Sequence, residues 1–473
     1  MDNKRVQLIF FIIFSFVNVG LYLLAVDQEK RGRILSPTYL NTPDGQRYWG
    51  VAINLAERGK FTVRTAGSTI RYRHIEKERP NPDLPLSEAV RLPRKSRTVS
   101  EEPLARAGPL PALLFSIPIK IVGFDKAPAF IVSFQCALLF ALSLLVRSLA
   151  VPFRCNGNFL QGLLIFNPNL IGLAHHAQSE LIFVFLFTVI LWFCSRLLTA
   201  SKPATRMEII LLGLCIGLLP LARPLGLYLI VAIPILLLIS LWIQSGSFRG
   251  RYLNFQKLIF ISLIAGLVML PWSVRNYAVF GEFTLTQSEG IMMQWHYTSM
   301  KLYLGEGDSR NNLADVILPE DSEKLNECNS VRGPKCSQLA AVEYFKAIVD
   351  QSPGDLIYAL SSSWVKLLFS GGATQIANYI GVDRPDAHNF LYGKANWYHS
   401  SLKLMKEFLR NHQLFSVIFL FCMAFAAIAR TLGVIGLAAV QGRHLWSITV
   451  FYLFLITIFL LMYLFSGIGR FRA

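Results

Sequence analysis

Long apolar runs alternate with polar segments along the chain. Most of these runs hold about 18 or more residues with almost no charge, the length that crosses a bilayer as an α-helix. A helix is expected because the bilayer interior offers no partner to free backbone polar groups. The runs predicted to cross are 6–26, 128–147, 159–174, 178–198, 208–222, 224–243, 257–275, 413–430 and 445–466. The pattern therefore predicts an all-α polytopic membrane protein with about nine transmembrane helices, within a range of about 9–11.

Two further apolar stretches, 108–124 and 356–371, fit less well as transmembrane helices. Prolines or polar residues interrupt both, namely Pro109, Pro111, Pro118 and Lys120 in the first and Ser361, Ser362, Ser363 and Lys366 in the second. Such helices are expected to lie along the outer interface of the membrane. The alternative, a full crossing at each stretch, would place several basic loops outside and stays open at this point.

Lysine and arginine residues in the short loops indicate the orientation. They gather between consecutive runs, at Arg147, Arg154, Arg196, Lys202, Arg206, Arg249, Arg251, Lys257, Arg430 and Arg443. Cytoplasmic loops are enriched in these residues. These basic loops all lie on the same side of the membrane as Lys4 and Arg5 only if the two ambiguous stretches do not cross it. The N-terminus is then inside, the number of crossings is odd, and the long segments 27–107 and 277–412 face outward.

The first apolar run also resembles a signal peptide, because it follows a short basic start. No small-x-small cleavage site comes before Asp27, so we predict a retained anchor. The expected organisation is a transmembrane core at 1–279 that includes the first outer loop, a second outer loop at 280–412 and C-terminal transmembrane helices at 413–473.

Composition and charge agree with this class of protein. Hydrophobic residues make up 53% of the chain and charged residues 16%, whereas a soluble domain carries about 25% charged residues. The net charge of +17 is typical of cytoplasmic Lys and Arg that contact anionic lipid. Membrane lipids are therefore expected as partners, and nucleic acid is not.

Two cysteines lie close together in the second outer loop. Cys328 and Cys336 bracket a short Gly-Pro turn. In an oxidising compartment such a pair forms a disulfide, and otherwise the two thiols stay unpaired. The residues alone leave both readings open.

The segment after the first apolar run has the signals of a capped helix. Thr42 is a suitable N-cap, Pro43 fits the first helical position, and Gly59 stands where a left-handed C-cap belongs. Asp44 falls in the first turn, where the helix dipole favours its ionised form, and Tyr48 follows on the same face. From these residues alone, an ordinary first-turn acid on a surface helix is the favoured interpretation of Asp44.

This Asp, followed by Tyr48 and a Gly-x-Phe sequence, resembles the GT-C superfamily of membrane glycosyltransferases. The closest likeness is to family 39 and its bacterial relatives, which include protein mannosyltransferases and the lipid A aminoarabinose transferase. Further segments similar to the family pattern follow in order, namely Ala105-Arg-Ala-Gly-Pro-Leu-Pro, Gln178-Ser-Glu-Leu-Ile-Phe183, Leu221-Ala-Arg-Pro224, Leu270-Pro-Trp-Ser-Val-Arg-Asn-Tyr-Ala-Val-Phe-Gly281 and Gly469-Arg-Phe-Arg472. The sequence departs from the pattern at Ala107, where the family has Pro, and at Gly45, where it often has a second acid.

The resemblance implies both a fold and a reaction. The GT-C fold has seven helices before its second large outer loop, which agrees with the count made from charge. Its enzymes pass a sugar from a polyprenyl-phosphate carrier to an acceptor at the extracytoplasmic face, with inversion, in a bacterial inner or plasma membrane. Beyond this lipid-linked donor, no cofactor is required.

The family positions give each candidate residue a role. Asp44 is the candidate catalytic base, and Glu180 is a second catalytic candidate. The donor phosphate is expected to contact arginines, whose planar fork suits phosphate oxygens, at Arg106, Arg275, Arg470 and Arg472. Supporting roles are expected for Tyr48, Arg223, Asn276 and His176. For each arginine the alternative is an interfacial anchor, and for Glu180 it is a helix-start acid at the interface.

A metal site and two other classes of function are the alternatives to this interpretation. His175, His176 and Glu180 include ligand types for a metal, but adjacent histidines point to different faces, so we predict no metal. A flippase for lipid-linked sugars would use acids inside several spans. Few are present, and no internal repeat typical of transporters is visible. A non-catalytic homologue stays open, although an intact Asp44 favours an enzyme.

Overall fold

The computed structural model describes most of the first two thirds of the chain. The described residues are 3–30, 43–64, 101–103, 108–150, 156–199, 205–244, 248–286, 289–304, 334–369, 417, 421, 424, 451–453 and 455. The chain forms two compact units: the first comprises Met1–Pro271, Asn378–Gly381 and Val440–Phe451, and the second comprises Trp272–Ala377, Val382–Ala439 and Tyr452–Ala473.

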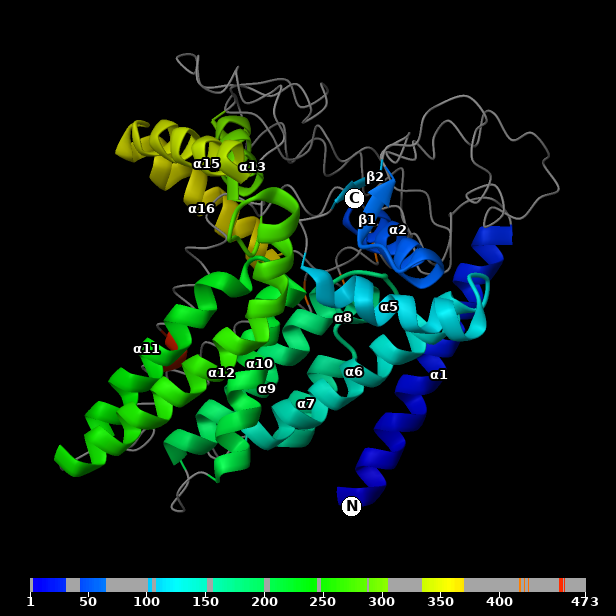
Figure 1. The fold of residues 1–473 in the computed structure, drawn as a ribbon. Coiled ribbons are helices and arrows are strands. Elements are labelled where there is room, and N and C mark those ends of the chain that lie inside the picture. Colours follow the sequence, from blue (N-terminus) through cyan, green and yellow to red (C-terminus); the bar gives the residue numbers. More distant parts are fainter. Residues whose placement is uncertain are drawn as a thin grey trace, which may run out of the picture. The chain divides into compact units, whose positions relative to one another are not determined.

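The described part of the chain is almost entirely helical (Figure 1). In the first unit the elements are α1 (Asn3–Lys30), α2 (Pro43–Arg58), β1 (Thr62–Arg64), β2 (Glu101–Pro103), α5 (Pro109–Val122), α6 (Ala127–Leu149), α7 (Gly157–Ile165), α8 (Pro168–Ala174), α9 (Glu180–Thr199), α10 (Arg206–Ala222), α11 (Gly226–Gln244) and most of α12 (Phe248–Phe280). The second unit holds the end of α12 and α13 (Glu289–Tyr303), α15 (Pro334–Val349) and α16 (Pro353–Phe369).

Among the described residues, four helices are long and apolar enough to cross a membrane. They are Lys4–Gln28, Ala127–Leu149, Glu180–Leu198 and Phe255–Phe280. Two shorter apolar helices are Pro109–Val122 and Gly226–Trp242. These features are those of a helical membrane protein, as the apolar runs predicted. The runs at 413–430 and 445–466 lie outside the described residues apart from single positions.

The prediction of one continuous helix over 159–174 is wrong. The run is divided into α7 and α8 at Phe166 and Asn167. The side chain of Asn167 caps α8 by accepting a hydrogen bond from the backbone N–H of Asn169 at 2.9 Å. Pro168 occupies the first turn, and a proline disfavours helical backbone at the residue before it. Hydropathy alone does not register this break, because both halves are apolar.

Side-chain pairs determine the relative directions of α9 and α10. Arg196 near the end of α9 pairs with Glu208 near the start of α10, with 2.9 Å between Nη2 and Oε1. Glu180 at the start of α9 pairs with Arg223, which follows α10, with 2.5 Å between Oε1 and Nη1. The two helices are therefore antiparallel. We call the two ends of the first-unit helices the Arg196 end and the Arg223 end.

Side-chain contacts also give the directions of α6 and α1. Residue Gln135 of α6 meets His176, just before α9, so α6 begins at the Arg223 end. Residue Gln7 of α1 meets Gln161 of α7, with 2.8 Å between Nε2 and Oε1. Asn18, further along α1, meets His175, so α1 runs from the Arg196 end toward the Arg223 end.

Helix α5 runs across the Arg223 end (Figure 1). It starts after Gly108, where a Cβ atom would overlap the carbonyl oxygen of Leu221 at the end of α10. It stops at Val122, shortly before α6 begins at the same end. Both termini of α5 therefore lie at one end of the first-unit helices.

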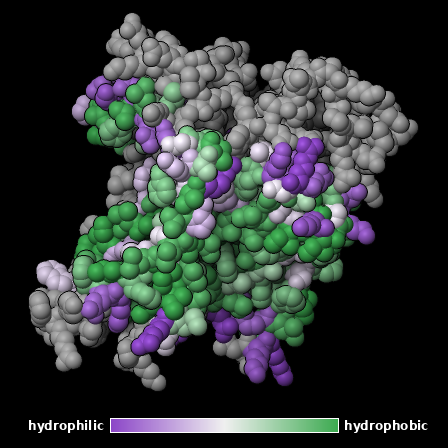
Figure 2. All heavy atoms as spheres, in the orientation of Figure 1, coloured by the Kyte–Doolittle hydropathy of each residue, from purple (hydrophilic) through white to green (hydrophobic). Residues whose placement is uncertain are grey.

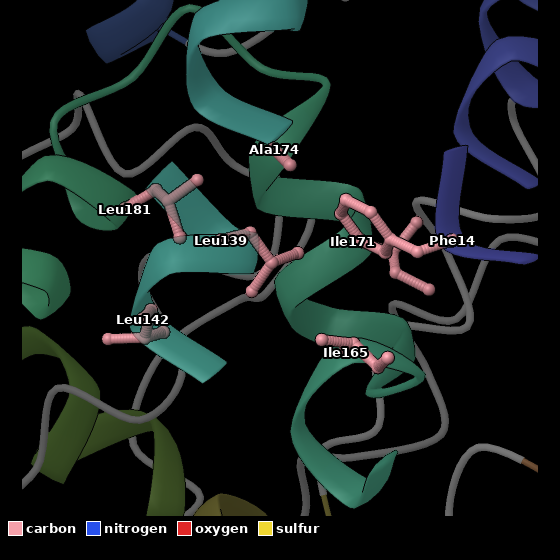
Figure 3. Packing of buried hydrophobic residues seen from close by; sticks show 7 residues of the cluster. All are labelled: Phe14, Leu139, Leu142, Ile165, Ile171, Ala174 and Leu181. Carbon is pink, nitrogen blue, oxygen red and sulfur yellow. The ribbon is translucent and has the colours of Figure 1, made fainter. Parts of the chain in front are cut away.

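A cluster of buried apolar side chains joins the first helices of this unit (Figure 3). It draws on α1, α6, α7, α8 and α9, with the buried members Phe14, Leu139, Leu142, Ile165, Ile171, Ala174 and Leu181. The outward faces of the helices are also apolar, and Figure 2 shows this surface as a broad green region. Large exposed apolar faces mark surfaces that contact lipid or another protein.

Glycines allow α10 and α12 to approach closely. A Cβ on Gly217 would lie 2.7 Å from the carbonyl oxygen of Ala265, and one on Gly213 would lie 2.9 Å from that of Ile261. Small residues at helix contacts let backbones meet in membrane proteins. Since Gly213 and Gly217 meet successively later positions of α12, the two helices are parallel.

We expect Gly217→Ala to destabilise the protein by about 2 kcal/mol, because overpacked cores force backbone shifts. The matched control is Gly266→Ala in α12, where a Cβ would have no atom within 4 Å. That change is expected to be neutral or slightly stabilising, since alanine is the better helix former. Thermal unfolding in detergent measures both, and equal melting temperatures would contradict the packing described for Gly217.

The second unit contains a smaller core. Residues of α13, α15 and α16 form it, namely Tyr297, Met300, Leu304, Tyr344, Ile348 and Ala359. The stretch 356–371 is helical as far as Phe369 and contributes Ala359. Cys336, at the start of α15, is disulfide-bonded. Cys328, one of the two cysteines of the pair considered from the sequence, lies outside the described residues.

Candidate functional site

The helix that carries Asp44 forms as its local signals predict. Pro43 is the first residue of α2, and Gly59 ends it with a φ of 65°, a left-handed conformation that glycine adopts without strain. The N–H of Gly59 donates to the carbonyl of Leu55 at 3.0 Å. Asp44 therefore occupies the first helical turn. Its side chain and Thr42 lie outside the described part of the structure.

One face of α2 packs onto α5 and brings Asp44 to the Arg223 end. Tyr48, Trp49 and Ala52 are buried on α2, and the rings of Trp49 and Phe124 lie 5.5 Å apart. Tyr48, predicted to support the site, is thus part of this packed helix. Because α5 lies across the Arg223 end, α2 with Asp44 lies at that end as well.

A short β-pair closes the loop that follows α2. Strands β1 and β2 are antiparallel, and Thr62 faces Pro103. The side-chain amide of Asn54 donates to the carbonyl of Thr62 at 2.9 Å, which ties β1 to α2. The pairing therefore brings Glu101–Pro103 to lie beside Thr62–Arg64 and α2.

Glu180 and Arg223 form an ion pair at the Arg223 end. The side chain of Arg223 is only 5% exposed, and that of Glu180 is 20% exposed. Arg223 has an extended backbone that leaves the helix, and the N–H of Gly226 closes the turn onto its carbonyl at 2.9 Å. Oε2 of Glu180 is buried and has no hydrogen-bond partner among the described residues.

Sequence reasoning selected Glu180 and Arg223 separately and missed that they pair. It also missed two buried amides in apolar helices, Gln135 of α6 and Asn18 of α1. The signal for both was present, since a polar residue inside a predicted span is a functional candidate by default.

The two histidines before α9 are buried and neutral. Burial lowers the pKa of His176 to about 3, and burial together with the neighbouring His176 lowers the pKa of His175 to about 3. His176, predicted as a supporting residue, contributes its backbone carbonyl, which accepts from Gln135. Among the described residues, no group of three or more His, Cys, Asp and Glu side chains is placed to hold a metal ion.

Acid is therefore expected to destabilise the protein. An unfolded histidine has a pKa of about 6.5, so below that pH the unfolded chain binds protons that the folded chain does not. The free energy of unfolding falls by about 1.4 kcal/mol per pH unit for each such histidine, and the contribution is complete above about pH 6.5. Melting temperatures measured in detergent from about pH 7 to about pH 5 should decline. The decline should be shallower in His175→Asn, and an unchanged slope in that variant would contradict the assignment.

In the second unit, Arg275 and Asn276 organise the turn after α12. The guanidinium of Arg275 lies over the ring of Trp272, 4.8 Å from its centroid, and its Nη1 donates to Oδ1 of Asn276 at 2.9 Å. Asn276 is fully buried and donates to the carbonyl of Thr284 at 2.8 Å. Asn276 thus orders the turn and accepts a hydrogen bond that orients Arg275.

The candidate residues therefore fall into three groups. Asp44, Tyr48, Glu180, Arg223 and His176 belong to the first unit, near or at its Arg223 end. Arg275 and Asn276 belong to the second unit. The remaining candidates, Arg106, Arg470 and Arg472, lie outside the described residues.

No family model matches the chain, and no curated protein matches it. A functional assignment therefore has to rest on the geometry of the candidate residues and on their chemistry.

Proposed function

We propose that this protein is an inverting glycosyltransferase that moves a sugar from a polyprenyl-phosphate donor to an acceptor at the extracytoplasmic face of a membrane. The observation that carries the proposal is the gathering of α2, with Asp44, and the Glu180–Arg223 pair at one end of the first-unit helices. The basic residues Lys4 and Arg5 lie at the opposite end, which supports an outward-facing Arg223 end.

The proposed topology has nine crossings with the N-terminus inside. In the first unit, α1, α6, α9, α10, α11 and α12 each make one crossing, and α7 with α8 makes another. The remaining two are the runs 413–430 and 445–466. We propose that this arrangement is a GT-C fold, which would place the protein in a bacterial inner or plasma membrane.

In the proposed reaction, Asp44 accepts the proton of an acceptor hydroxyl. The acceptor oxygen forms a bond to the anomeric carbon on the face opposite the phosphate, and the bond between this carbon and the phosphate oxygen breaks. Its electron pair leaves with the polyprenyl phosphate, so the anomeric centre is inverted. A positioned base of this kind contributes about 10²- to 10⁴-fold to a rate.

The leaving phosphate needs cations, and Arg275 is a suitable one. Its stacking on Trp272 and its hydrogen bond to Asn276 hold the guanidinium in a fixed plane, and preorganised donors stabilise developing charge best. Arg106, Arg470 and Arg472 are proposed to share this role. Arg223 is paired with Glu180, so we assign it to shaping the site. Glu180, which holds Arg223 by this ion pair, is assigned to the same role.

The test is to incubate the purified full-length protein in lipid nanodiscs with a panel of polyprenyl-phosphate sugars and candidate acceptors. Release of polyprenyl phosphate that depends on the acceptor would support the proposal. Movement of the lipid-linked sugar across the bilayer without release would favour a flippase. If neither occurs with any donor, while the protein stays folded, the transferase proposal fails and a non-catalytic homologue becomes the better reading.

A further inference from the structure

The segment from His175 to Ser179, between α8 and α9, is polar but buried. Its side chains are almost completely inaccessible, with His175 fully buried and His176 2% exposed. Burying polar groups in this way is unfavourable unless they are hydrogen-bonded. The partners that satisfy this segment therefore also determine where it lies.

One partner comes from α6. The side-chain amide of Gln135, which is fully buried, donates from Nε2 to the carbonyl oxygen of His176 at 2.5 Å. The same carbonyl accepts the backbone N–H of Gln178 at 2.8 Å. Gln135 therefore binds the carbonyl oxygen that also closes the tight backbone turn from His176 to Gln178.

A second partner comes from α1. Asn18 donates from Nδ2 to the carbonyl of Phe14 at 2.8 Å, which leaves its Oδ1 as an acceptor. Nε2 of His175 lies 3.0 Å from this oxygen, and Sγ of Cys136 lies 3.4 Å from it. Because Oδ1 has no proton to give, His175 must carry its proton on Nε2. Asn18 thus fixes both the tautomer and the ring of His175.

The segment leads directly into Glu180. The carbonyl of Ser179 accepts the N–H of Phe183 at 2.9 Å, so Ser179 already belongs to the first turn of α9. A displacement of the segment would move the start of α9 and, with it, the carboxylate that pairs with Arg223.

We propose that Gln135 and Asn18 are positioning residues that act through His176 and His175 to hold Glu180 against Arg223. The inference deepens the proposed function, since it names residues that order the candidate active site without touching substrate. Because it concerns the placement of Glu180 against Arg223, it can be tested without a known substrate.

The test measures how strongly Glu180 and Arg223 are coupled. Melting temperatures of the full-length protein are measured for Glu180→Gln, Arg223→Gln and the double variant, and the non-additive part is the coupling. The same cycle is then repeated in a Gln135→Met background, which keeps volume but removes the donor. We expect the coupling to fall by at least half.

The matched control is Gln161→Met. Gln161 is also fully buried and hydrogen-bonded, with 2.7 Å from its Nε2 to Oε1 of Gln7, but it lies toward the Arg196 end. Its substitution should lower the melting temperature and leave the Glu180–Arg223 coupling unchanged. Equal coupling in the Gln135→Met and Gln161→Met backgrounds would overturn the proposal.

A second variant covers the case in which Gln135→Met does not fold. Asn18→Leu removes the acceptor for His175 and should reduce the coupling, whereas Asn18→Asp keeps that acceptor and should retain it. Loss in both variants, or in neither, would also overturn the proposal.

If the wild type transfers no sugar, the proposed function fails, but the coupling between Glu180 and Arg223 still decides whether Gln135 and Asn18 are positioning residues. If it does, Gln135→Met should lower kcat with little change in the KM for donor.

Discussion

Replacing Asp44 by asparagine is expected to slow sugar transfer by about 10²- to 10⁴-fold, because an amide cannot take the proton that a carboxylate base accepts. Asparagine keeps the size of the side chain and its place in the first turn of α2. The loss of an acid at a helix N-terminus costs about 0.3–1 kcal/mol, so the variant should remain folded. The measurement is the initial rate of acceptor-dependent release of polyprenyl phosphate.

The matched control for this experiment is Asp125→Asn. Asp125 is an exposed acid between α5 and α6, at the same end of the first unit as α2. Its substitution should leave the rate of transfer within about twofold, since surface changes away from special features have small effects. Equal rates for wild type and Asp44→Asn would remove Asp44 from the chemistry, whatever the outcome for the control.

Glu180→Gln is expected to lower the free energy of unfolding by about 3 kcal/mol, because it leaves the buried guanidinium of Arg223 without its counter-charge. Adding Arg223→Met to this variant should restore part of the loss, since an apolar side chain carries no desolvation penalty for charge. Chemical or thermal denaturation in detergent measures both variants. The transfer rate of Glu180→Gln should fall as well, because Arg223 then loses the carboxylate that holds it in the site.

The other ion pair of the same two helices is the control. The side chain of Arg196 is 52% exposed, so Arg196→Gln should cost only about 0–1 kcal/mol. A loss for Arg196→Gln as large as that for Glu180→Gln would mean that burial does not distinguish the two pairs.

Local signals made α2 predictable from the sequence. Proline at the first helical position and glycine after the last one act through the backbone of their own neighbours, so no tertiary information was needed. The break between α7 and α8 also has a local signal, at Asn167 and Pro168, but the uniform hydropathy of the run obscured it.

The contacts at the Arg223 end could not be predicted in the same way. The pairing of Glu180 with Arg223, and that of Gln135 with the carbonyl of His176, depend on how separate helices pack. Sequence identified the first two residues as candidates from their position in motifs. It could not assign them to each other, because hydrophobic periodicity specifies which residues are buried and not which neighbours they meet.

Helices α9 and α10 each carry an acid near the N-terminus and a base near the C-terminus, Glu180 with Arg196 and Glu208 with Arg223. Each side-chain charge is thus opposite in sign to the partial charge at its helix end, which is a favourable interaction. Antiparallel packing then brings unlike charges together at both ends. A slip of one helix along the other by a single turn, about 5.4 Å, would separate both pairs at once. The register of this hairpin is therefore specified electrostatically as well as by side-chain shape, which restricts it to one alignment as the chain enters the bilayer.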